Sequence, residues 1–598
     1  MRIKPGNRRK LIEAALGERP LDLLITNIQL VNVLTEEIYP ADIGIFEGFI
    51  AHVETRKKKK NSSEMAAGAH KETDIFDGHQ LYALPGLIDS HVHIESSLMT
   101  PDNFAESVLP RGTTTVITDP HEIANVLGME GVEYMLEKSI DLPMNQFVLV
   151  PSCIPSAPDF EQSGAYFGRD EIKTLLQKDR VLGLAEVMDY PGVIFGSERM
   201  RSILDIALQK DVFIQGHSPG LSGRKLSAYL CAGPESDHEI TEADEMWEKL
   251  RAGMTVDARE SSISQDLARL IPGLKQGKLP LNFTLCTDDR EPDDLLGEGQ
   301  MDHVVRRAID EGMQPLKAIK AASYQSARRV GLRNLGALAP GFTADLMLSE
   351  SIEAPEAEYV FFRGQLAAEK GELKDKFSTR SSKIEKKNTI FLDKLEADDF
   401  KVEAPADRKE FKVHVINYPK KDTLITELQT REITQKNGFL DYTAQKNLNL
   451  LSVFNRYPGN DNRARGFIAN FGLKNGAVAS TVSHDCHNLT VAAVNPEDAV
   501  LAAEAVISSG GGIACARNGQ LEALLELPVA GLMSDKSINY VVPQVKNVKQ
   551  ELRTMGIKDK HPLLKISTLT LAVIPEVKMT DRGLVDVNNQ RFIPLFVE

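Results

Sequence analysis

LPGLIDSHVH at residues 84–93 is a short apolar run that ends in two histidines, and seven comparable runs follow it along the chain. Their length and composition are typical of buried β-strands. Helical segments such as RMRSILDIALQK (199–210) separate them. Eight strands alternating with helices predict a (β/α)₈ barrel over residues 84–334. An open doubly wound sheet is the alternative, because one run is short and polar. The seven later runs are 113–119, 147–153, 181–187, 212–217, 234–239, 254–260 and 281–289.

The segments that flank the predicted barrel suggest two further units. Short β-rich runs at 23–53, broken by Pro40 and Gly48, are typical of antiparallel strands. LGALAPGFTADLMLS (335–349) is also β-like and could complete the same sheet. We expect a small β-sandwich built from both flanks, a charged linker, a C-terminal α+β domain and a solvated hairpin tip at the KKKK run (57–60). The expected ranges are 1–83 and 335–365 for the small domain, 366–399 for the linker and 400–598 for the C-terminal domain.

The composition excludes several classes of protein. Hydrophobic residues make up 42% of the 598 positions and charged residues 26%, which is typical of globular proteins and not of disordered ones. Acidic residues outnumber basic ones by 85 to 70, and this balance disfavours binding to nucleic acid or anionic membranes. The five cysteines show no CxxC spacing, and no uncharged apolar run approaches the about 18 residues of a membrane span. We therefore expect a cytoplasmic protein.

Polar residues end the predicted strands at positions that core packing would not select. His91 and His93 lie two apart on one strand, so their side chains point the same way. The carboxyl ends of barrel strands form the active-site face, where four more strand-end residues should join them. Burying these imidazoles and carboxylates without partners would cost several kcal/mol per unpaired ion. The additional strand-end residues are Glu186, His217, His238 and Asp288.

Two divalent metal ions would remove this cost. Six ligands exceed one tetrahedral site, so we expect one ion on His91, His93 and Asp288, a second on His217 and His238, and Glu186 between them. Nitrogen and oxygen ligands without thiolate fit Mn²⁺, Fe²⁺ and Zn²⁺. We expect Mn²⁺ or Fe²⁺ before Zn²⁺.

Several stretches resemble one known family. PGLIDSHVHIESS (85–97) is similar to the first-strand motif of the amidohydrolase superfamily, and the six ligands match its metal ligands strand by strand. TDPHEIANVLG (118–128) and CTDDREPDDL (286–295) resemble signature sequences of the adenine deaminase family. GGIACARNGQLEALLELPVAGLMSD (511–535) resembles the C-terminal domain of that family. Many superfamily members have a carbamylated lysine at the position of Glu186, whereas adenine deaminases have glutamate.

The resemblance implies hydrolytic deamination of adenine to hypoxanthine and ammonia, in purine salvage, by a hydroxide that bridges the metals. The partner would be a small purine base, with neither nucleic acid nor membrane involved, and we expect a homo-oligomer, either a dimer or a tetramer. One alternative is a related hydrolase that acts on a cyclic amide or on another aminated heterocycle. A non-enzymatic barrel is a third alternative, but it predicts eroded ligands, and all six are present.

A second cluster lies at the end of the next strand. Attack at C6 of adenine places charge on N1, so an acid is needed there. His121 and Glu122 are the nearest candidates; Asp119, Glu95 and Ser96 could contact the base. The alternative is that Asp119 caps a helix and His121 bonds to backbone. The histidines of SHDCH (483–487) have no nearby carboxylate pattern, so a structural or lid role is favoured over substrate or metal binding.

Overall fold

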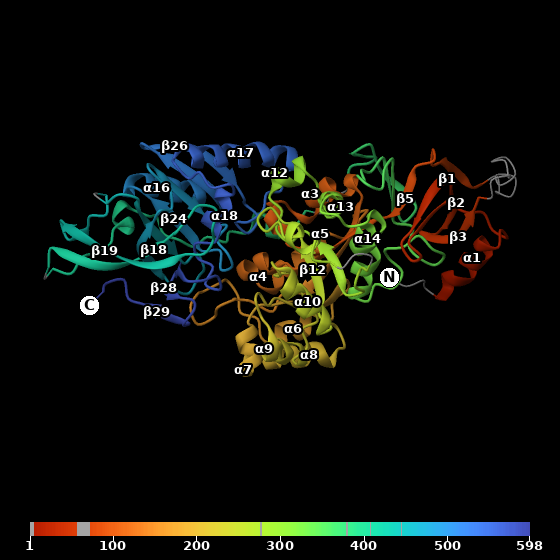
Figure 1. The fold of residues 1–598 in the computed structure, drawn as a ribbon. Coiled ribbons are helices and arrows are strands. Elements are labelled where there is room, and N and C mark those ends of the chain that lie inside the picture. The colour runs from red at the N-terminus through yellow and green to blue at the C-terminus, as the bar shows by residue number, and fades with distance from the viewer. Residues whose placement is uncertain are drawn as a thin grey trace.

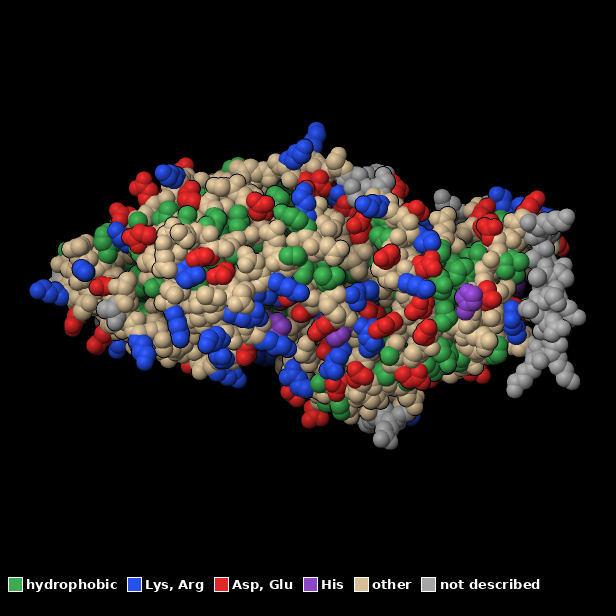
Figure 2. All heavy atoms as spheres, turned by 90° about the horizontal axis from the view of Figure 1, so that it is seen from above, with side chains coloured by type: hydrophobic (Ala, Val, Ile, Leu, Met, Phe, Trp, Pro, Cys, Tyr) green, Lys and Arg blue, Asp and Glu red, His purple; other side chains and the backbone are tan. Residues whose placement is uncertain are grey.

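The computed structural model describes residues 5–56, 72–274, 278–377, 381–406, 408–443 and 445–597. Figure 1 shows an elongated arrangement, with the N-terminal sheet at one end, the barrel in the middle and the C-terminal domain at the other end. The KKKK run at 57–60, expected at a hairpin tip, lies outside the described residues. On the face drawn in Figure 2, acidic and basic side chains are intermingled. Among the helices of the described ranges, none is long and apolar enough to span a membrane.

Segments from both flanks of the barrel form the N-terminal sheet, as expected. Its strand order is β17-β16-β15-β14-β5-β1-β2-β3, β4 pairs with β1, and helix α1 (Pro5–Ala15) packs beside β3. The expected linker at 366–399 is wrong in its first part, because β16 and β17 pair as a hairpin at the sheet edge. Edge strands often carry charged side chains, so the charge of this segment did not distinguish a strand from a linker. The bounds are β1 Leu23–Asn32, β2 Glu37–Phe46, β3 Phe49–Thr55, β4 Asp74–Asp77, β5 Tyr82–Pro85, β14 Leu346–Ser349, β15 Tyr359–Phe362, β16 Gln365–Glu369 and β17 Glu372–Leu373.

Eight parallel strands form the barrel. Strands β6 to β10 pair in sequence order, and so do β11 to β13. Two contacts join these groups: the amide of Asp288 donates to the carbonyl of His91 at 3.0 Å, and the amide of Glu235 donates to the carbonyl of Ile214 at 2.8 Å. The sheet therefore closes, which excludes the open-sheet alternative. The strands are β6 Leu87–Val92, β7 Thr113–Thr118, β8 Asn145–Val150, β9 Val181–Val187, β10 Phe213–Gly216, β11 Ser236–Asp237, β12 Thr255–Arg259 and β13 Phe283–Cys286.

Amphipathic helices cover the barrel. In α8 (Glu198–Gln209) the hydroxyl of Ser197 accepts from the amide of Met200 and caps the N-terminus, while Ile203 and Ala207 are buried one helical turn apart. This spacing places one apolar stripe of the helix against the strands. Other helices of the barrel are α3 Pro101–Val108, α4 His121–Leu127, α5 Met129–Lys138, α6 Arg169–Leu175, α9 Gly223–Cys231, α10 Ala243–Arg251, α12 Pro292–Gly297 and α13 Met301–Asp310.

The C-terminal domain contains a nine-stranded sheet, a three-stranded sheet (β27-β28-β29) and helices, and it packs directly on the barrel. One hydrophobic core joins Phe104 of the barrel helix α3 with Val541 and Val545 of α17. The strand order is β20-β19-β18-β22-β21-β24-β23-β25-β26. Its elements are β18 Glu410–Asn417, β19 Glu427–Lys436, β20 Phe439–Leu440, β21 Leu448–Phe454, β22 Arg463–Ala469, β23 Ala477–Ser480, β24 Leu489–Ala493, α16 Pro496–Ser508, β25 Gly512–Arg517, β26 Gln520–Glu526, α17 Ile538–Thr554, α18 Pro562–Ser567, β27 Val577–Thr580, β28 Gly583–Asp586 and β29 Arg591–Ile593.

An ion cluster between α12 and α17 fastens this domain to the mouth of the barrel. The ammonium of Lys549 donates to Glu291 Oε2 at 2.6 Å and to Asp293 Oδ1 at 2.7 Å. Lys549→Met would leave Asp293 without its cation and Glu291 with His561 alone, so we expect a loss of about 3 kcal/mol, at the lower end of the cost of breaking a buried pair because both carboxylates are partly exposed. The midpoint of thermal unfolding should fall. Lys546→Met, on the exposed side of α17, is the matched control; equal midpoints for both variants would contradict the prediction.

Candidate active site

The six residues predicted as metal ligands lie together at the carboxyl ends of the barrel strands. His91 lies in β6 and His93 directly follows it, and their rings lie 4.7 Å apart between centroids, edge to face. Glu186 is the sixth residue of β9, while the other three follow β10, β11 and β13. Five of the six are buried and His217 is half-buried, so bulk water screens this group of charges only weakly. The three residues that follow strands are His217, His238 and Asp288.

Glu186 contacts all four imidazoles. Its Oε1 lies 3.4 Å from His91 Nε2 and 3.1 Å from His93 Nε2. Its Oε2 lies 2.5 Å from His217 Nδ1 and 3.4 Å from His238 Nε2. Each oxygen therefore faces one pair of imidazoles, which is the arrangement that a carboxylate bridging two cations requires.

Asp288 stands opposite Glu186 at the end of the last strand. Its Oδ1 lies 3.5 Å from His91 Nε2 and 3.2 Å from His93 Nε2, while Arg259 donates to its Oδ2 at 3.0 Å. Burial alone would raise the pKa of Asp288, but its contacts with the imidazoles of His91 and His93 and the charge of Arg259 hold it well below its usual value. Asp288 is therefore a carboxylate at neutral pH.

The hydrogen bonds of these histidines fit metal ligation. His93 Nδ1 lies 2.9 Å from the carbonyl of Asp119, which can only accept, so Nδ1 donates and, in the neutral ring, Nε2 turns a lone pair toward Glu186 and Asp288. Both ring nitrogens of His91 lack a hydrogen-bond partner within the described ranges. A cation between the imidazoles and the carboxylates would satisfy the Nε2 atoms of His91 and His93, which face Glu186 and Asp288. The ligand atoms of two sets lie within 4.8 Å of one another: His91, His93 and Asp288, and His91, Glu186 and His238.

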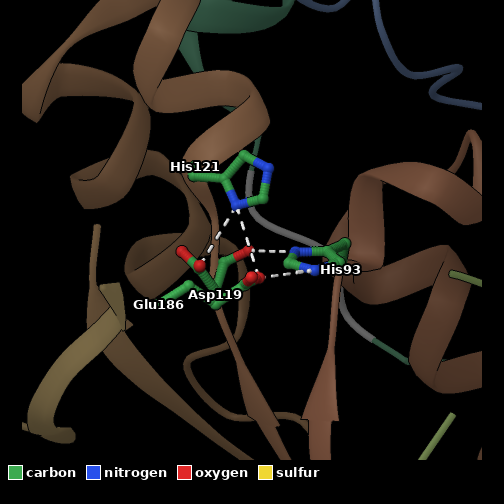
Figure 3. A group of neighbouring side chains, drawn as sticks. All are labelled: His93, Asp119, His121 and Glu186. Atoms are coloured by element: carbon green, nitrogen blue, oxygen red, sulfur yellow. Dashed lines mark hydrogen bonds and ion pairs between the residues drawn. The ribbon is translucent and has the colours of Figure 1, made fainter. Parts of the chain in front are cut away.

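Asp119 and His121 lie beside this centre, at the junction of β7 and α4. Figure 3 shows their side chains facing His93 and Glu186. His121 Nδ1 is 3.1 Å from Asp119 Oδ2 and 3.9 Å from Glu186 Oε1. The alternative in which Asp119 caps the helix is wrong, since α4 begins after Pro120 without a side-chain cap. The expected contact of Asp119 with substrate is not favoured either, because its carboxylate points at His121 and it does not line the neighbouring pocket.

A pocket opens between the barrel mouth and the C-terminal domain. Most of the polar residues that line the pocket come from the barrel. The C-terminal domain contributes apolar side chains and two histidines. Of the predicted residues, Glu95, Ser96 and Glu122 line this pocket. Ser96 donates to Asp289 Oδ1 at 2.5 Å, and Glu95 Oε1 accepts from the amide of Ile123 at 3.2 Å. The residues from the C-terminal domain are Val482, His484, His487, Ile513, Leu532, Leu563, Leu564 and Ser567.

The surroundings of Glu122 differ from the expectation that it donates a proton. Its Oε1 lies 2.6 Å from His484 Nδ1 and 3.3 Å from His121 Nε2, and its Oε2 contacts His487 Nε2. Although burial opposes it, the three imidazoles lower the pKa of Glu122 well below its usual value. Glu122 is thus an acceptor. Burial, together with the charge of Glu122, raises the pKa of Glu95 to about 7, so this pocket carboxyl is partly protonated near neutral pH.

Sequence reasoning missed Arg259 and Glu239. The guanidinium of Arg259 contacts the carboxylate of Glu239 as well as that of Asp288. Glu239 Oε1 also lies 3.5 Å from His238 Nε2. A signal was present for Arg259, because the run MTVDARE (254–260) ends at the same face as the ligand-bearing strands. Only strand-end histidines and carboxylates were considered as ligands, so a cation that orients a ligand carboxylate was passed over.

Comparison with known proteins places the chain in a family. The model of the amidohydrolase family matches residues 82–368, and the model of the adenine deaminase C-terminal domain matches residues 423–591. Proteins named adenine deaminase from Kosmotoga olearia and Methanothrix thermoacetophila are each 39% identical over 588 residues; the first alignment covers 98% of both chains, the second 98% of this chain and 99% of the other. Adenine deaminase 2 from Carboxydothermus hydrogenoformans is 36% identical over 587 residues, covering 98% and 99%. The chain belongs to the adenine deaminase family.

Both matched regions contribute to the site. The six predicted ligands lie in the part that matches the amidohydrolase family, whereas His484 and His487 lie in the part that matches the adenine deaminase C-terminal domain. In the described structure both parts line one pocket, where His484 and His487 contact Glu122. The distinctive C-terminal domain of adenine deaminases is therefore part of the candidate site in this chain.

Proposed function

We propose that this chain catalyses the hydrolytic deamination of adenine to hypoxanthine and ammonia. The observation that carries the proposal is the position of Glu186, whose two oxygens face three buried imidazoles and the half-buried one of His217, beside a pocket that the C-terminal domain helps to line. Similarity to proteins named adenine deaminase over 98% of the chain supports adenine as the substrate.

The proposed cofactors are two divalent cations, Mn²⁺ or Fe²⁺ before Zn²⁺. His91, His93 and Asp288 would hold one, and His217 and His238 the other, with Glu186 between them. When bound, such ions lower the pKa of water and make it a nucleophile at neutral pH. The absence of thiolate among these ligands agrees with Mn²⁺ or Fe²⁺, for which imidazole and carboxylate are suitable donors.

The residues around the pocket suit a flat heterocycle with polar edges. Apolar side chains such as Leu532 and Leu564 can cover the faces of the ring, which removes apolar area from water. Glu95 and Ser96 lie on the barrel side, where they can hydrogen-bond the edge of the base. Asp288 would accept and donate the protons near the amine. His121 Nδ1 lies 3.9 Å from Glu186 Oε1, beside the same centre.

Ammonia release tests this function directly. The metal-loaded protein should release ammonia from adenine faster than from adenosine, cytosine or guanine, and it should not open hydantoin rings. Preference for another aminated heterocycle, or hydrolysis of a cyclic amide without ammonia release, would favour the related hydrolase instead. No turnover of any of these compounds would refute both functions.

Removing the metals should abolish activity and also lower stability. Ligands that bind only the folded state stabilise it by RT ln(1 + [L]/Kd), about 4 kcal/mol at a thousandfold excess over Kd. A chelator should therefore lower the midpoint of thermal unfolding as it removes turnover, and Mn²⁺ should restore both. An unchanged midpoint and unchanged turnover after the metal content has fallen to zero would contradict the proposed centre.

The cysteines support a reducing compartment, and we propose the cytoplasm. All five are free, and four of them are buried. Burial raises the pKa of Cys153 and Cys286 well above the usual value, which leaves these thiols protonated and unreactive. Buried, unpaired thiols of this kind are typical of proteins that fold where disulfides do not persist.

A further inference from the structure

His484 occupies a fixed position on the C-terminal side of the pocket. It lies in the connection between β23 and β24, where its amide donates to the carbonyl of Ser567, the last residue of α18, at 2.8 Å. Its side chain lines the pocket and is 15% exposed to solvent. The backbone of the C-terminal domain therefore holds this imidazole facing the barrel mouth.

The two ring nitrogens of His484 have different surroundings. Nδ1 lies 2.6 Å from Glu122 Oε1, and since a carboxylate only accepts, Nδ1 donates. Nε2 has no hydrogen-bond partner within the described part of the chain, although the ring borders the pocket. Burial opposes protonation, but the charge and hydrogen bond of Glu122 raise the pKa of His484 to about 9. Near neutral pH both nitrogens of this ring can donate.

The same cluster could be read as a metal site, since ligand atoms of Glu122, His484 and His487 lie within 4.8 Å of one another. The hydrogen bonds argue against this reading. The amide of Ser483 donates to His487 Nδ1 at 3.2 Å, so in the neutral ring the hydrogen of His487 is on Nε2, which faces Glu122. No lone pair remains on that side for a cation. Glu122 is instead an anion in contact with both imidazoles.

We propose that His484 is a substrate-binding residue whose Nε2 donates a hydrogen bond to a ring nitrogen of the purine, while Glu122 and His487 position it. This inference rests on the proposed function. Ring nitrogens of a purine present lone pairs in the plane of the ring, so they need donors at the edge of the pocket. The barrel side offers mainly carboxyl groups, Glu95, Asp289 and Glu291 among them, and a carboxyl donates only while it is protonated. His487 directs its hydrogen to Glu122, which leaves His484 as the imidazole able to donate into the pocket.

A consequence for the fold is that the C-terminal domain takes part in substrate recognition. The barrel carries the predicted metal ligands, but His484, the proposed donor to the purine ring, belongs to the C-terminal domain. Its contact with Glu122 on α4 of the barrel holds it in position. The Lys549 cluster near the same pocket, with Glu291 on its lining, keeps the two parts in register. Loss of the donor should therefore affect binding of the base even where the metal ligands are intact.

Two substitutions separate the contacts of the ring. In His484→Asn the amide can replace Nδ1 and keep the contact with Glu122, whereas in His484→Gln the longer amide can replace Nε2. The probe is 6-methylpurine, which keeps the ring nitrogens but has no amine to lose, so binding is measured by calorimetry on the metal-loaded protein without turnover. We expect His484→Asn to bind about 10- to 100-fold more weakly, the loss of one hydrogen bond to a charged donor, and His484→Gln to recover most of the affinity.

Analogues that lack one ring nitrogen identify the acceptor. The 1-deaza, 3-deaza and 7-deaza forms of 6-methylpurine are compared on the parent and on His484→Asn. One of them should bind the parent more weakly by the same factor and be insensitive to the substitution, because the two changes remove the same hydrogen bond. His414→Asn is the matched control, since His414 lies on β18, where its ring contacts the carbonyl of Pro594, and does not line the pocket.

The outcomes distinguish this inference from the proposed function. Parent-like affinity in a folded His484→Asn protein, or equal losses for every analogue in parent and variant, would refute the contact even if adenine is deaminated. If His484→Asn fails to fold, parent-like discrimination among the analogues by His484→Phe would refute it as well. Binding that behaves as expected without ammonia release from adenine would refute the proposed function and leave the contact standing. No binding of 6-methylpurine by the parent would refute both.

Discussion

Glu186→Gln is expected to lose metal and turnover together. The amide has the shape of the carboxylate but no charge, and its NH₂ group must face one of the two imidazole pairs that now face Glu186 Oε1 and Oε2. Two cations held a few ångströms apart repel strongly in a buried site, and the anion between them is what offsets that repulsion. Substitutions one shell further out cost about 10- to 100-fold in metal affinity, so losing the shared ligand should cost at least about 100-fold.

The measurement is the metal content of the purified variant, taken beside its rate of ammonia release. Glu198→Gln, at an exposed position at the start of α8, makes the same chemical change away from the site and should match the parent in both. Two metals per chain in Glu186→Gln with near-parental turnover would remove Glu186 from its proposed position between the ions. Loss of turnover with full metal content would give it a catalytic role without a bridging one.

The barrel and its ring of polar residues were predictable from local patterns. His91 and His93 point the same way because they are two apart on a strand, and parallel strands bring Glu186 and Asp288 to the same face whatever their separation along the chain. Neither inference needs a side-chain contact to be known in advance. The chain order of strands and helices was enough, and the structure brings all six residues together.

The contacts of Glu122 could not be predicted in the same way. The sequence around SHDCH (483–487) shows no carboxylate pattern typical of a metal site; the carboxylate that contacts both of its histidines comes from α4 of the barrel. The packing of the C-terminal domain on the barrel decides this contact, and the hydrophobic periodicity of the sequence carries no information about it. The same limit explains the edge hairpin within 365–373, whose charged sequence is compatible with either an edge strand or a linker.

Asp288→Asn should retain metal and lose most of the rate. Asp288 has a positive φ of 60°, a backbone conformation that asparagine tolerates well, so this substitution changes the charge without straining the chain as alanine would. The Asn side-chain oxygen can still face His91 and His93, where Oδ1 now lies 3.5 and 3.2 Å from their Nε2 atoms. Any loss of rate with retained metal therefore reports on the missing proton acceptor.

The size of that loss follows from what Asp288 would do. As the bond from water oxygen to C6 of adenine forms, a base must take the proton, and the departing amine must receive one to leave as ammonia. Arg259, together with His91 and His93, keeps Asp288 ionised and ready to accept. Losing a general base typically costs about 10² to 10⁴ in rate, or roughly 3 to 5.5 kcal/mol of barrier. Asp310→Asn on the surface is the control; a fully metallated Asp288→Asn protein within a few fold of the parent rate would show that another group carries the proton.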